Sequence, residues 1–201
     1  MHRLTENTIE DIVNRSVNHK NMNNHNDLNI NNKYKVLFVC HGNICRSPMA
    51  EYVMKHLVKE QGREEEFEIT SGAVSREEIG NDIYPPAKRK LQEKGVDFSK
   101  HRAHQITPDE FSANDLIITM DSSNMRLLGR IVPNWESAAP GENIPAGKIV
   151  GKVHMMMEFA EPQGASGKWG VPDVADPWYT RDFEQTYQDV LAGCRGLLEL
   201  I

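Results

Sequence analysis

The sequence predicts an α/β fold with a parallel sheet and helices on both of its faces. Two runs of apolar residues, at 36–39 and within 115–120, are typical of strands that are buried on both sides. A segment with apolar residues at helical spacing follows the first run, and an alternating pattern typical of a strand follows at 67–71. A strand, a crossover helix and a second strand in one sheet form a parallel pair. The sheet is therefore expected to be parallel.

Each predicted element has a local signal. Ser47-Pro48 opens the helix after the first strand, because proline favours the first helical positions, and Gln61-Gly62 ends it. Asp121-Ser122 is typical of a helix N-cap. The predicted elements are strands at 35–39, 67–71, 115–120 and 152–160, helices at 47–61, 84–95, 121–128 and 183–201, and loops at 133–149 and 161–174.

Residues 1–33 differ in composition from the rest of the chain. Asparagine dominates this segment and large apolar residues are few. Such a segment cannot bury enough apolar surface to offset the entropy lost on ordering. We therefore predict a disordered, asparagine-rich tail at 1–33 and one folded domain at 34–201.

Composition and charge argue against several classes of protein. The 201-residue chain has a net charge of −6 and a pI of about 5.8, which disfavours nucleic acid as a partner. It has no long apolar run that would span a membrane and no secretory signal pattern. Its three cysteines form no even disulfide framework, which fits a reducing cytoplasm. No Cys/His cluster has zinc-ligand spacing, so neither a metal nor another cofactor is expected.

The stretch from Val36 to Glu51 carries the clearest chemical signal, a Cys-x5-Arg sequence between a strand and a helix. Loop N–H groups and the helix dipole there favour an oxyanion such as phosphate, and Gly42 lets the backbone approach it closely. Arg46 can bind two phosphate oxygens. The same positive field stabilises a thiolate at Cys40. A thiolate beneath a phosphate cradle indicates nucleophilic attack on phosphorus.

This stretch closely resembles the signature of the low-molecular-weight protein tyrosine phosphatases, and the resemblance covers nearly all of 34–201 except the loops 133–149 and 161–174. It implies a phosphatase I-like three-layer sandwich whose four parallel strands have the order 2-1-3-4. It also implies hydrolysis of phosphotyrosine or other aryl phosphates through a phosphocysteine. In that reaction Cys40 is the nucleophile and Arg46 binds phosphate together with the loop residues His41, Gly42, Asn43, Ile44, Cys45 and Ser47.

Cleavage of a phosphate monoester also needs an acid that protonates the leaving oxygen. Asp176-Pro177 precedes the C-terminal helix, which is where the family carries its Asp-Pro acid motif. Alone, an Asp-Pro pair is more typical of a turn, but Cys-x5-Arg in the same chain favours the acid. The resemblance therefore implies that Asp176 protonates the leaving group and then activates water.

The resemblance also implies residues that support the loop. Asn43 is expected to brace it in a network with Ser47, Ser71 and His101, although His101 in its basic surroundings would otherwise be interpreted as a surface imidazole. Cys45 matches the second loop cysteine of the family. It could trap an oxidised Cys40 as a disulfide, or it could be a buried thiol without a role.

The sequence gives partial information on substrate preference. Trp178 and Tyr179 follow the acid, as an aromatic pair does in the family, and can form a cleft wall that stacks on a phenyl ring. Ile44 occupies a position that is threonine in related phosphoarginine enzymes, so isoleucine favours phosphotyrosine. His41 and Glu77 depart from the family at the rim, which leaves the protein substrate undefined.

Two other functions remain open alternatives. Arsenate reduction uses a similar loop but needs two further cysteines on a mobile segment, and beyond Cys45 only Cys194 is present, on the apolar face of a helix. A phosphotyrosine-binding module without catalysis would be expected to lack Cys40, Arg46 or Asp176, yet all three are present. The expected partner is a phosphotyrosine-containing protein or a small aryl phosphate, without nucleic acid or membrane, and the chain is expected to be a monomer or weak dimer.

Overall fold

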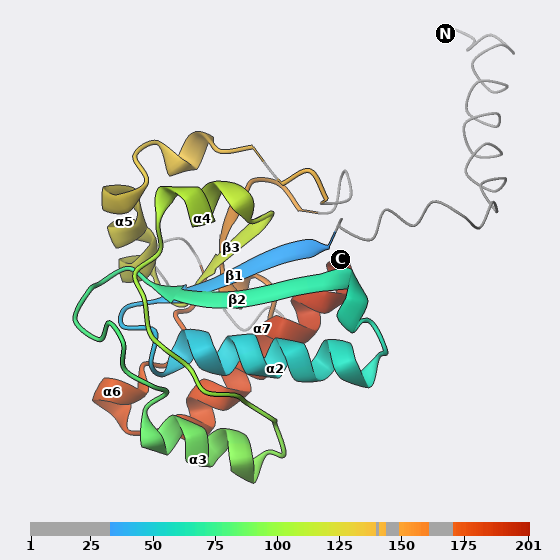
Figure 1. The fold of residues 1–201 in the computed structure, drawn as a ribbon, viewed down its shortest axis with the longest axis vertical. Coiled ribbons are helices and arrows are strands. Elements are labelled where there is room, and N and C mark those ends of the chain that lie inside the picture. Colours follow the sequence, from blue (N-terminus) through green and yellow to red (C-terminus); the bar gives the residue numbers. More distant parts are fainter. Residues whose placement is uncertain (1–32, 140, 144–148, 161–170) are drawn as a thin grey trace, which may run out of the picture. The chain divides into compact units, whose positions relative to one another are not determined.

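The computed structural model describes residues 33–139, 141–143, 149–160 and 171–201. Its sheet contains β1 (Tyr34–Cys40), β2 (Phe67–Ala73), β3 (Leu116–Thr119) and β4 (Val153–Met155). All neighbouring strands are parallel and the order is β2-β1-β3-β4 (Figure 1). The predicted fold class and strand order are confirmed. Residues 1–32 of the predicted tail lie outside the described residues, so the domain boundary stays a prediction.

Helices cover both faces of the sheet. Figure 1 shows α2 and α7 on one face and α4 and α5 on the other. The helices are α2 (Arg46–Glu60), α3 (Pro85–Glu93), α4 (Pro108–Ala113), α5 (Ser122–Ile131), α6 (Pro177–Thr180) and α7 (Phe183–Leu200), with short 3₁₀ helices η1 (Glu64–Glu66), η2 (Trp135–Ser137) and η3 (Met156–Glu158).

Strand β1 lies in the middle of the core and contributes to both of its layers. Val36 and Phe38 pack in the cluster that contains residues of α2 and α7. Leu37 and Val39 point the other way and pack with residues of α4 and α5. All four side chains are buried, because successive residues of a strand face opposite sides of the sheet. This explains why the sequence shows a continuous apolar run rather than an alternation.

The fourth strand is shorter than predicted. The expected strand at 152–160 is wrong in its second half, because β4 ends at Met155 and continues into η3. The Glu158 carboxylate accepts a hydrogen bond from the Met155 N–H at 2.8 Å, which closes the turn. A Cβ on Gly193 of α7 would collide with Met156, so the turn brings the chain close against that helix.

Two helical segments differ from the sequence prediction. Helix α5 continues to Ile131, beyond the expected end at 128. Helix α4 was not predicted, although Thr107 and Glu110 form a capping box in which each side chain bonds the backbone N–H of the other residue. The Thr-x-x-Glu spacing is a sequence signal for such a helix start.

An ion-pair cluster joins α3 to α7. The Glu184 carboxylate contacts the ammonium groups of Lys90 and Lys94, each at 2.8 Å. Hydrogen bonds from these two lysines lower the pKa of Glu184 from 4.5 to about 2. The cluster therefore stabilises the folded domain only while Glu184 is ionised.

Replacing Glu184 with glutamine is expected to lower the Tm at pH 7 by up to about 3 °C, because an exposed ion pair contributes little. A carboxyl whose pKa is depressed in the folded state adds stability above its unfolded-state pKa, and this stability is lost as the pH falls through the folded-state pKa. The difference in Tm between wild type and Glu184→Gln should thus be largest above about pH 5 and vanish toward pH 2. Thermal melts across this range test it, with the exposed Glu199→Gln on the same helix as control. A difference that does not change with pH would contradict the prediction.

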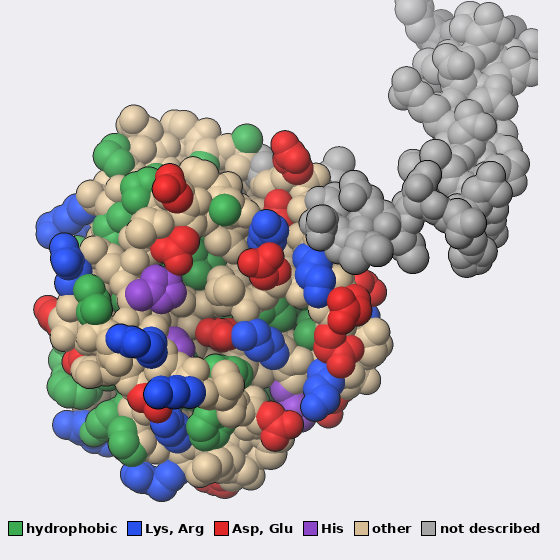
Figure 2. Space-filling model, viewed as in Figure 1, with side chains coloured by type: hydrophobic (Ala, Val, Ile, Leu, Met, Phe, Trp, Pro, Cys, Tyr) green, Lys and Arg blue, Asp and Glu red, His purple; other side chains and the backbone are tan. Residues whose placement is uncertain are grey.

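The surface of the domain mixes both signs of charge, as the face in Figure 2 shows. Within the described part of the chain, no helix is both long and apolar enough to cross a membrane.

Candidate active site

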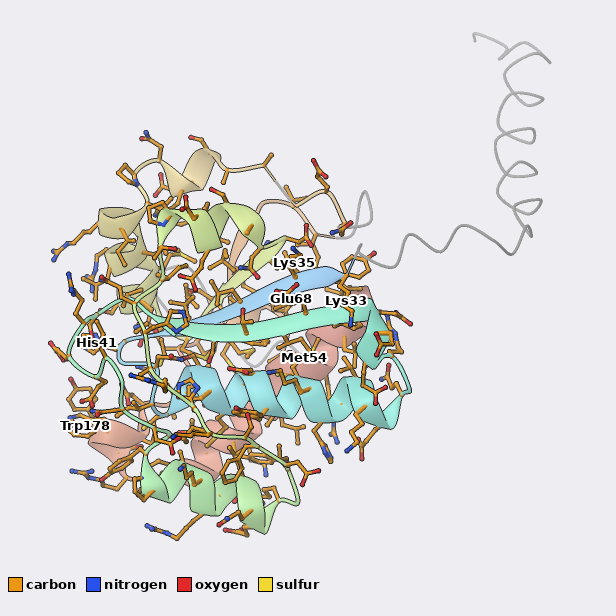
Figure 3. All side chains as sticks on the ribbon, viewed as in Figure 1. Lys33, Lys35, His41, Met54, Glu68 and Trp178 are labelled. Atoms are coloured by element: carbon orange, nitrogen blue, oxygen red, sulfur yellow. The ribbon has the colours of Figure 1, made fainter. Side chains whose placement is uncertain are left out.

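The candidate site lies at the carboxyl edge of the sheet, where parallel α/β folds bind their ligands. Cys40 is the last residue of β1 and pairs with Ala73 of β2. Figure 3 shows His41 and Trp178 at this same end of the sheet, opposite Lys33. Segments distant in sequence therefore meet where β1 turns into α2.

The loop between β1 and α2 is shaped to hold an anion. Asn43 adopts a left-handed conformation with φ of 57°, and its N–H donates to the Cys40 sulfur at 3.3 Å. Helix α2 begins at Arg46, and no side chain among the described residues caps its N-terminus at Cys45. The first N–H groups of the helix are thus available to an anion, with the helix dipole behind them.

A buried hydrogen-bond network holds this loop and reaches the Cys40 sulfur. The Asn43 Nδ2 donates to the hydroxyls of Ser47 at 3.0 Å and Ser71 at 2.9 Å. The Asn43 carbonyl contacts His101 Nε2 at 2.8 Å. The Ser47 hydroxyl lies 3.1 Å from the Cys40 sulfur. All five side chains are buried, so the expected group of Asn43, Ser47, Ser71 and His101 comes together around the loop.

The network continues to a residue that the sequence analysis did not identify. The Ser71 hydroxyl donates to the Glu51 carboxylate at 2.5 Å. The other oxygen of Glu51 contacts Lys55 Nζ at 2.5 Å. Glu51 is buried, whereas a glutamate four residues before a lysine on a helix normally indicates an exposed pair.

Arg46 is bound by two carboxylates. Its Nη1 lies 2.5 Å from Asp121 Oδ2, and its Nη2 lies 2.7 Å from Asp176 Oδ2. Burial acts to lower the pKa of Arg46, but the charges of Cys40, Asp121 and Asp176 outweigh this effect and raise it. The guanidinium is therefore a permanent cation beside the sulfur. Asp121, predicted as a helix cap at the carboxyl edge of the sheet, also accepts from the Asn124 N–H at 2.6 Å.

The segment that carries Asp176 is fixed on both sides. Before it, the Val174 N–H bonds the Met120 carbonyl at 2.9 Å, and the Ala175 N–H bonds Asp189 of α7 at 2.9 Å. After it, the Trp178 N–H donates to Asp176 Oδ1 at 3.0 Å, so the aspartate caps α6. Asp176 is thereby both a turn residue and a neighbour of Arg46.

The other two cysteines are protonated near neutral pH. Burial, followed by the negative charge at Cys40, raises the pKa of Cys45 to about 12. Burial also raises the pKa of Cys194, whose thiol lies inside the core on α7. All three cysteines are free thiols.

A cavity of about 280 Å³ opens above Cys40. Its rim carries His41 Nε2, which lies 3.0 Å from the Glu77 carboxylate. Glu78 covers Gly42 so closely that a Cβ there would press on its side chain. The lining residues are Cys40, His41, Gly42, Ile44, Cys45, Arg46, Glu77, Glu78, Asp121, Ser123, Asn124, Asp176, Trp178 and Tyr179.

The two aromatic residues of the cavity wall are exposed. Trp178 is 50% exposed and Tyr179 is 81% exposed. The Trp178 ring lies 6.0 Å from the ring of Tyr84 and 5.6 Å from the Arg181 guanidinium. Trp178 is thus held against the domain while one side of it faces solvent.

The structure therefore brings the predicted site residues to one place, nine of them in the cavity wall and the other four in the network behind it. Their roles stay predictions. Sequence analysis missed Glu51 and the contact between Asp121 and Arg46. In the part of the chain that the structure describes, no three His, Cys, Asp or Glu side chains are placed to hold a metal ion.

Comparison with known proteins gives a consistent picture. The family described as low molecular weight phosphotyrosine protein phosphatase matches residues 35–201. A Homo sapiens protein of that name is 37% identical over 169 residues, which is 82% of this chain and 93% of the human protein. The crystal structure of YfkJ from Bacillus subtilis is similar with a TM-score of 0.69 at 29% identity, covering 83% of this chain and 93% of that one. The low molecular weight protein tyrosine phosphatase SP-PTP from Streptococcus pyogenes has a TM-score of 0.62 at 37% identity, covering 82% and 91%.

Proposed function

The chain belongs to the low molecular weight phosphotyrosine protein phosphatase family, and from this premise we propose that it hydrolyses phosphotyrosine on proteins through a phosphocysteine. The observation that carries the proposal is the position of the Cys40 sulfur. It accepts hydrogen bonds from Ser47 and the Asn43 N–H at the base of the cavity, with Arg46 and Asp176 in the cavity wall. Hydrogen bonds donated to a sulfur stabilise the thiolate form, which is the nucleophile in such reactions.

In the first step, the Cys40 sulfur attacks phosphorus and the bond between phosphorus and the tyrosine oxygen breaks. Asp176 gives its proton to the departing phenolate, which leaves as the neutral phenol. Arg46 and the N–H groups at the start of α2 bind the equatorial phosphate oxygens, where negative charge spreads in the transition state. Substrate phosphate would then replace Asp176 as a partner of Arg46.

In the second step, Asp176 accepts a proton from water, and the resulting hydroxide oxygen forms a bond to phosphorus. The sulfur–phosphorus bond breaks and inorganic phosphate is released. The Ser47 hydroxyl, 3.1 Å from the sulfur, stabilises the thiolate as it leaves. Both steps use only groups of this chain and water.

The cavity walls support an aryl substrate. Ile44 and Trp178 both line the cavity, and an apolar side chain and an indole offer contact to a phenyl ring rather than to a charged guanidinium. The exposed Tyr179 at the mouth gives a further aromatic contact for the segment around phosphotyrosine. Because every group of this site comes from one chain, we propose that the protein acts as a monomer or weak dimer.

The cysteines also support a reducing compartment and phosphatase activity. Cys40 would lose its nucleophilicity on oxidation, which favours a reducing compartment such as the cytoplasm. Cys194 is enclosed in the core and its thiol contacts the Ala50 carbonyl, so it is poorly placed to relay a disulfide. This placement favours the phosphatase over the arsenate reductase.

The test is hydrolysis of p-nitrophenyl phosphate and of matched peptides that carry phosphotyrosine, phosphoserine or phosphoarginine, at pH 5–8 with EDTA present. We expect turnover without added metal, and a kcat/KM for the phosphotyrosine peptide at least about 100-fold above the other two, since a thiolate at the base of a deep cleft suits a flat aryl ester. Preference for phosphoarginine would contradict the substrate. Binding of vanadate without any turnover would favour the phosphotyrosine-binding module.

A further inference from the structure

We propose that Glu51 is a positioning residue for Cys40, because it sets the donor direction of the hydrogen-bond chain that ends on the nucleophile. The chain runs from Glu51 through Ser71, Asn43 and Ser47 to the Cys40 sulfur. Glu51 itself does not line the cavity. The effect of Glu51 on turnover rests on the proposed function, whereas its effect on the Cys40 thiol does not.

In the structure, the orientation of the Asn43 amide gives the middle of the hydrogen-bond chain its direction. The side-chain oxygen of Asn43 accepts from the backbone N–H of His104 at 3.3 Å, and a backbone N–H can only donate. The amide nitrogen of Asn43 must therefore face the two serine hydroxyls, and it donates one proton to each. Each serine oxygen is left with its own proton to place.

A carboxylate at one end determines where these protons go. Glu51 can only accept, so the Ser71 hydroxyl donates to it at 2.5 Å. The Ser47 hydroxyl already accepts from Asn43, and its own proton is directed to the Cys40 sulfur at 3.1 Å or to the Gly72 carbonyl at 3.2 Å. The hydrogen-bond chain thus leaves the Ser47 proton free to be donated to the sulfur, and such a bond stabilises a thiolate.

Without an acceptor at position 51, this arrangement of donors and acceptors no longer satisfies every hydroxyl group of the hydrogen-bond chain. The buried Ser71 hydroxyl would still accept from Asn43, but its own proton would have no acceptor, which is costly. This cost is relieved if the Asn43 amide turns and presents its oxygen to Ser71, at the loss of its 3.3 Å bond from the His104 N–H. The same oxygen then also attracts the proton of Ser47, and the Cys40 sulfur loses a donor.

Lys55 provides the countercharge that a buried glutamate needs. Its ammonium contacts the second oxygen of Glu51 at 2.5 Å, and its side chain is 43% exposed. Ser71 and Lys55 donate to different oxygens of the Glu51 carboxylate, whereas an amide would present its NH2 group to one of these two donors. This pairing allows a matched set of variants.

The experiment compares Glu51→Met/Lys55→Met with Glu51→Gln/Lys55→Met. The two variants have similar side-chain volume and charge, and only the second has an acceptor free to face Ser71. The first readout is the pH at which the rate of Cys40 alkylation by iodoacetamide reaches half its maximum. The second readout is kcat for p-nitrophenyl phosphate. The titratable groups that line the cavity together with Cys40 are unchanged in both variants: His41, Cys45, Arg46, Glu77, Glu78, Asp121 and Asp176.

We expect the Met/Met variant to raise the alkylation midpoint by about one pH unit and to lower kcat about tenfold, the size expected for loss of one hydrogen bond to a charged group. The Gln/Met variant should return to within about twofold of wild type. Glu60→Met, which removes an exposed pair with His56 on the same helix, should change neither readout. Equal midpoints in the two double variants would overturn the proposal.

Two further measurements separate the possible failures. If the Met/Met variant does not fold, Ser71→Ala interrupts the same series of hydrogen bonds with a smaller change in the side chain. It should shift the alkylation midpoint in the same direction. An unshifted midpoint in folded Ser71→Ala would overturn the proposal. If wild type hydrolyses no phosphate ester, the proposed function fails. The alkylation midpoint still tests Glu51 in that case, because it needs no turnover.

Discussion

Replacing Cys40 with serine is expected to lower kcat for p-nitrophenyl phosphate by at least about 10⁴-fold, because a serine hydroxyl near neutral pH is protonated and far less nucleophilic than a thiolate. Phosphate binding should survive. Arg46 and the uncapped N-terminus of α2, the groups proposed to hold the anion, are unchanged, and serine can still accept from Ser47 and the Asn43 N–H. Steady-state kinetics with inorganic phosphate as a competitive inhibitor measure both effects.

The matched control is Cys194→Ala, which removes a thiol buried on α7 away from the cavity. It should keep the kcat of wild type even where it lowers the Tm. The phosphocysteine itself should appear as a mass increase on a peptide containing Cys40 after rapid acid quenching. Substantial activity in Cys40→Ser would show that another group attacks phosphorus, and the mechanism proposed here would be abandoned.

Replacing Asp176 with asparagine is expected to lower kcat by about 10² to 10⁴-fold, the range of general acid catalysis. Asparagine keeps the shape and can still accept from the Trp178 N–H that caps α6, but it carries no transferable proton. The loss should depend on the leaving group. Phenolate needs protonation more than p-nitrophenolate, so phenyl phosphate should lose more rate than p-nitrophenyl phosphate.

Asp173→Asn is the control for this substitution. Asp173 lies shortly before Asp176 and accepts from the Ser122 N–H at 2.9 Å, and asparagine can make the same bond. Its kcat should equal that of wild type with both substrates. An equal loss with both leaving groups in Asp176→Asn would instead indicate that Asp176 acts through its contact with Arg46 and not as an acid.

The sheet was predictable because its signals are local. The apolar run at 36–39 and the crossover that follows determine a parallel pair, and the order 2-1-3-4 came with the family resemblance. The end of β4 was not predictable in the same way. Met155 turns because Glu158 bonds its N–H and because Gly193 of α7 leaves room for Met156, a contact between segments distant in sequence.

The site also has parts that local sequence signals predict and parts that depend on contacts between distant segments. The Cys-x5-Arg loop is contiguous, so its shape follows from a strand, a glycine-containing turn and a helix start. Asp176 needed the resemblance, because an Asp-Pro pair alone indicates a turn. Glu51 could not be identified, since its spacing from Lys55 is that of an ordinary surface pair. Only the fold shows that the first turns of α2 face the sheet, where Ser71 reaches the carboxylate.

The two anchors beside Asp176 have a consequence for the energy of catalysis. The backbone is tied to β3 and α7 just before the aspartate and enters α6 just after it. If Asp176 is the acid, as proposed, the entropy lost on restricting it in space is therefore lost when the domain folds and not at each turnover. Substrate binding has only to exchange one partner of Arg46.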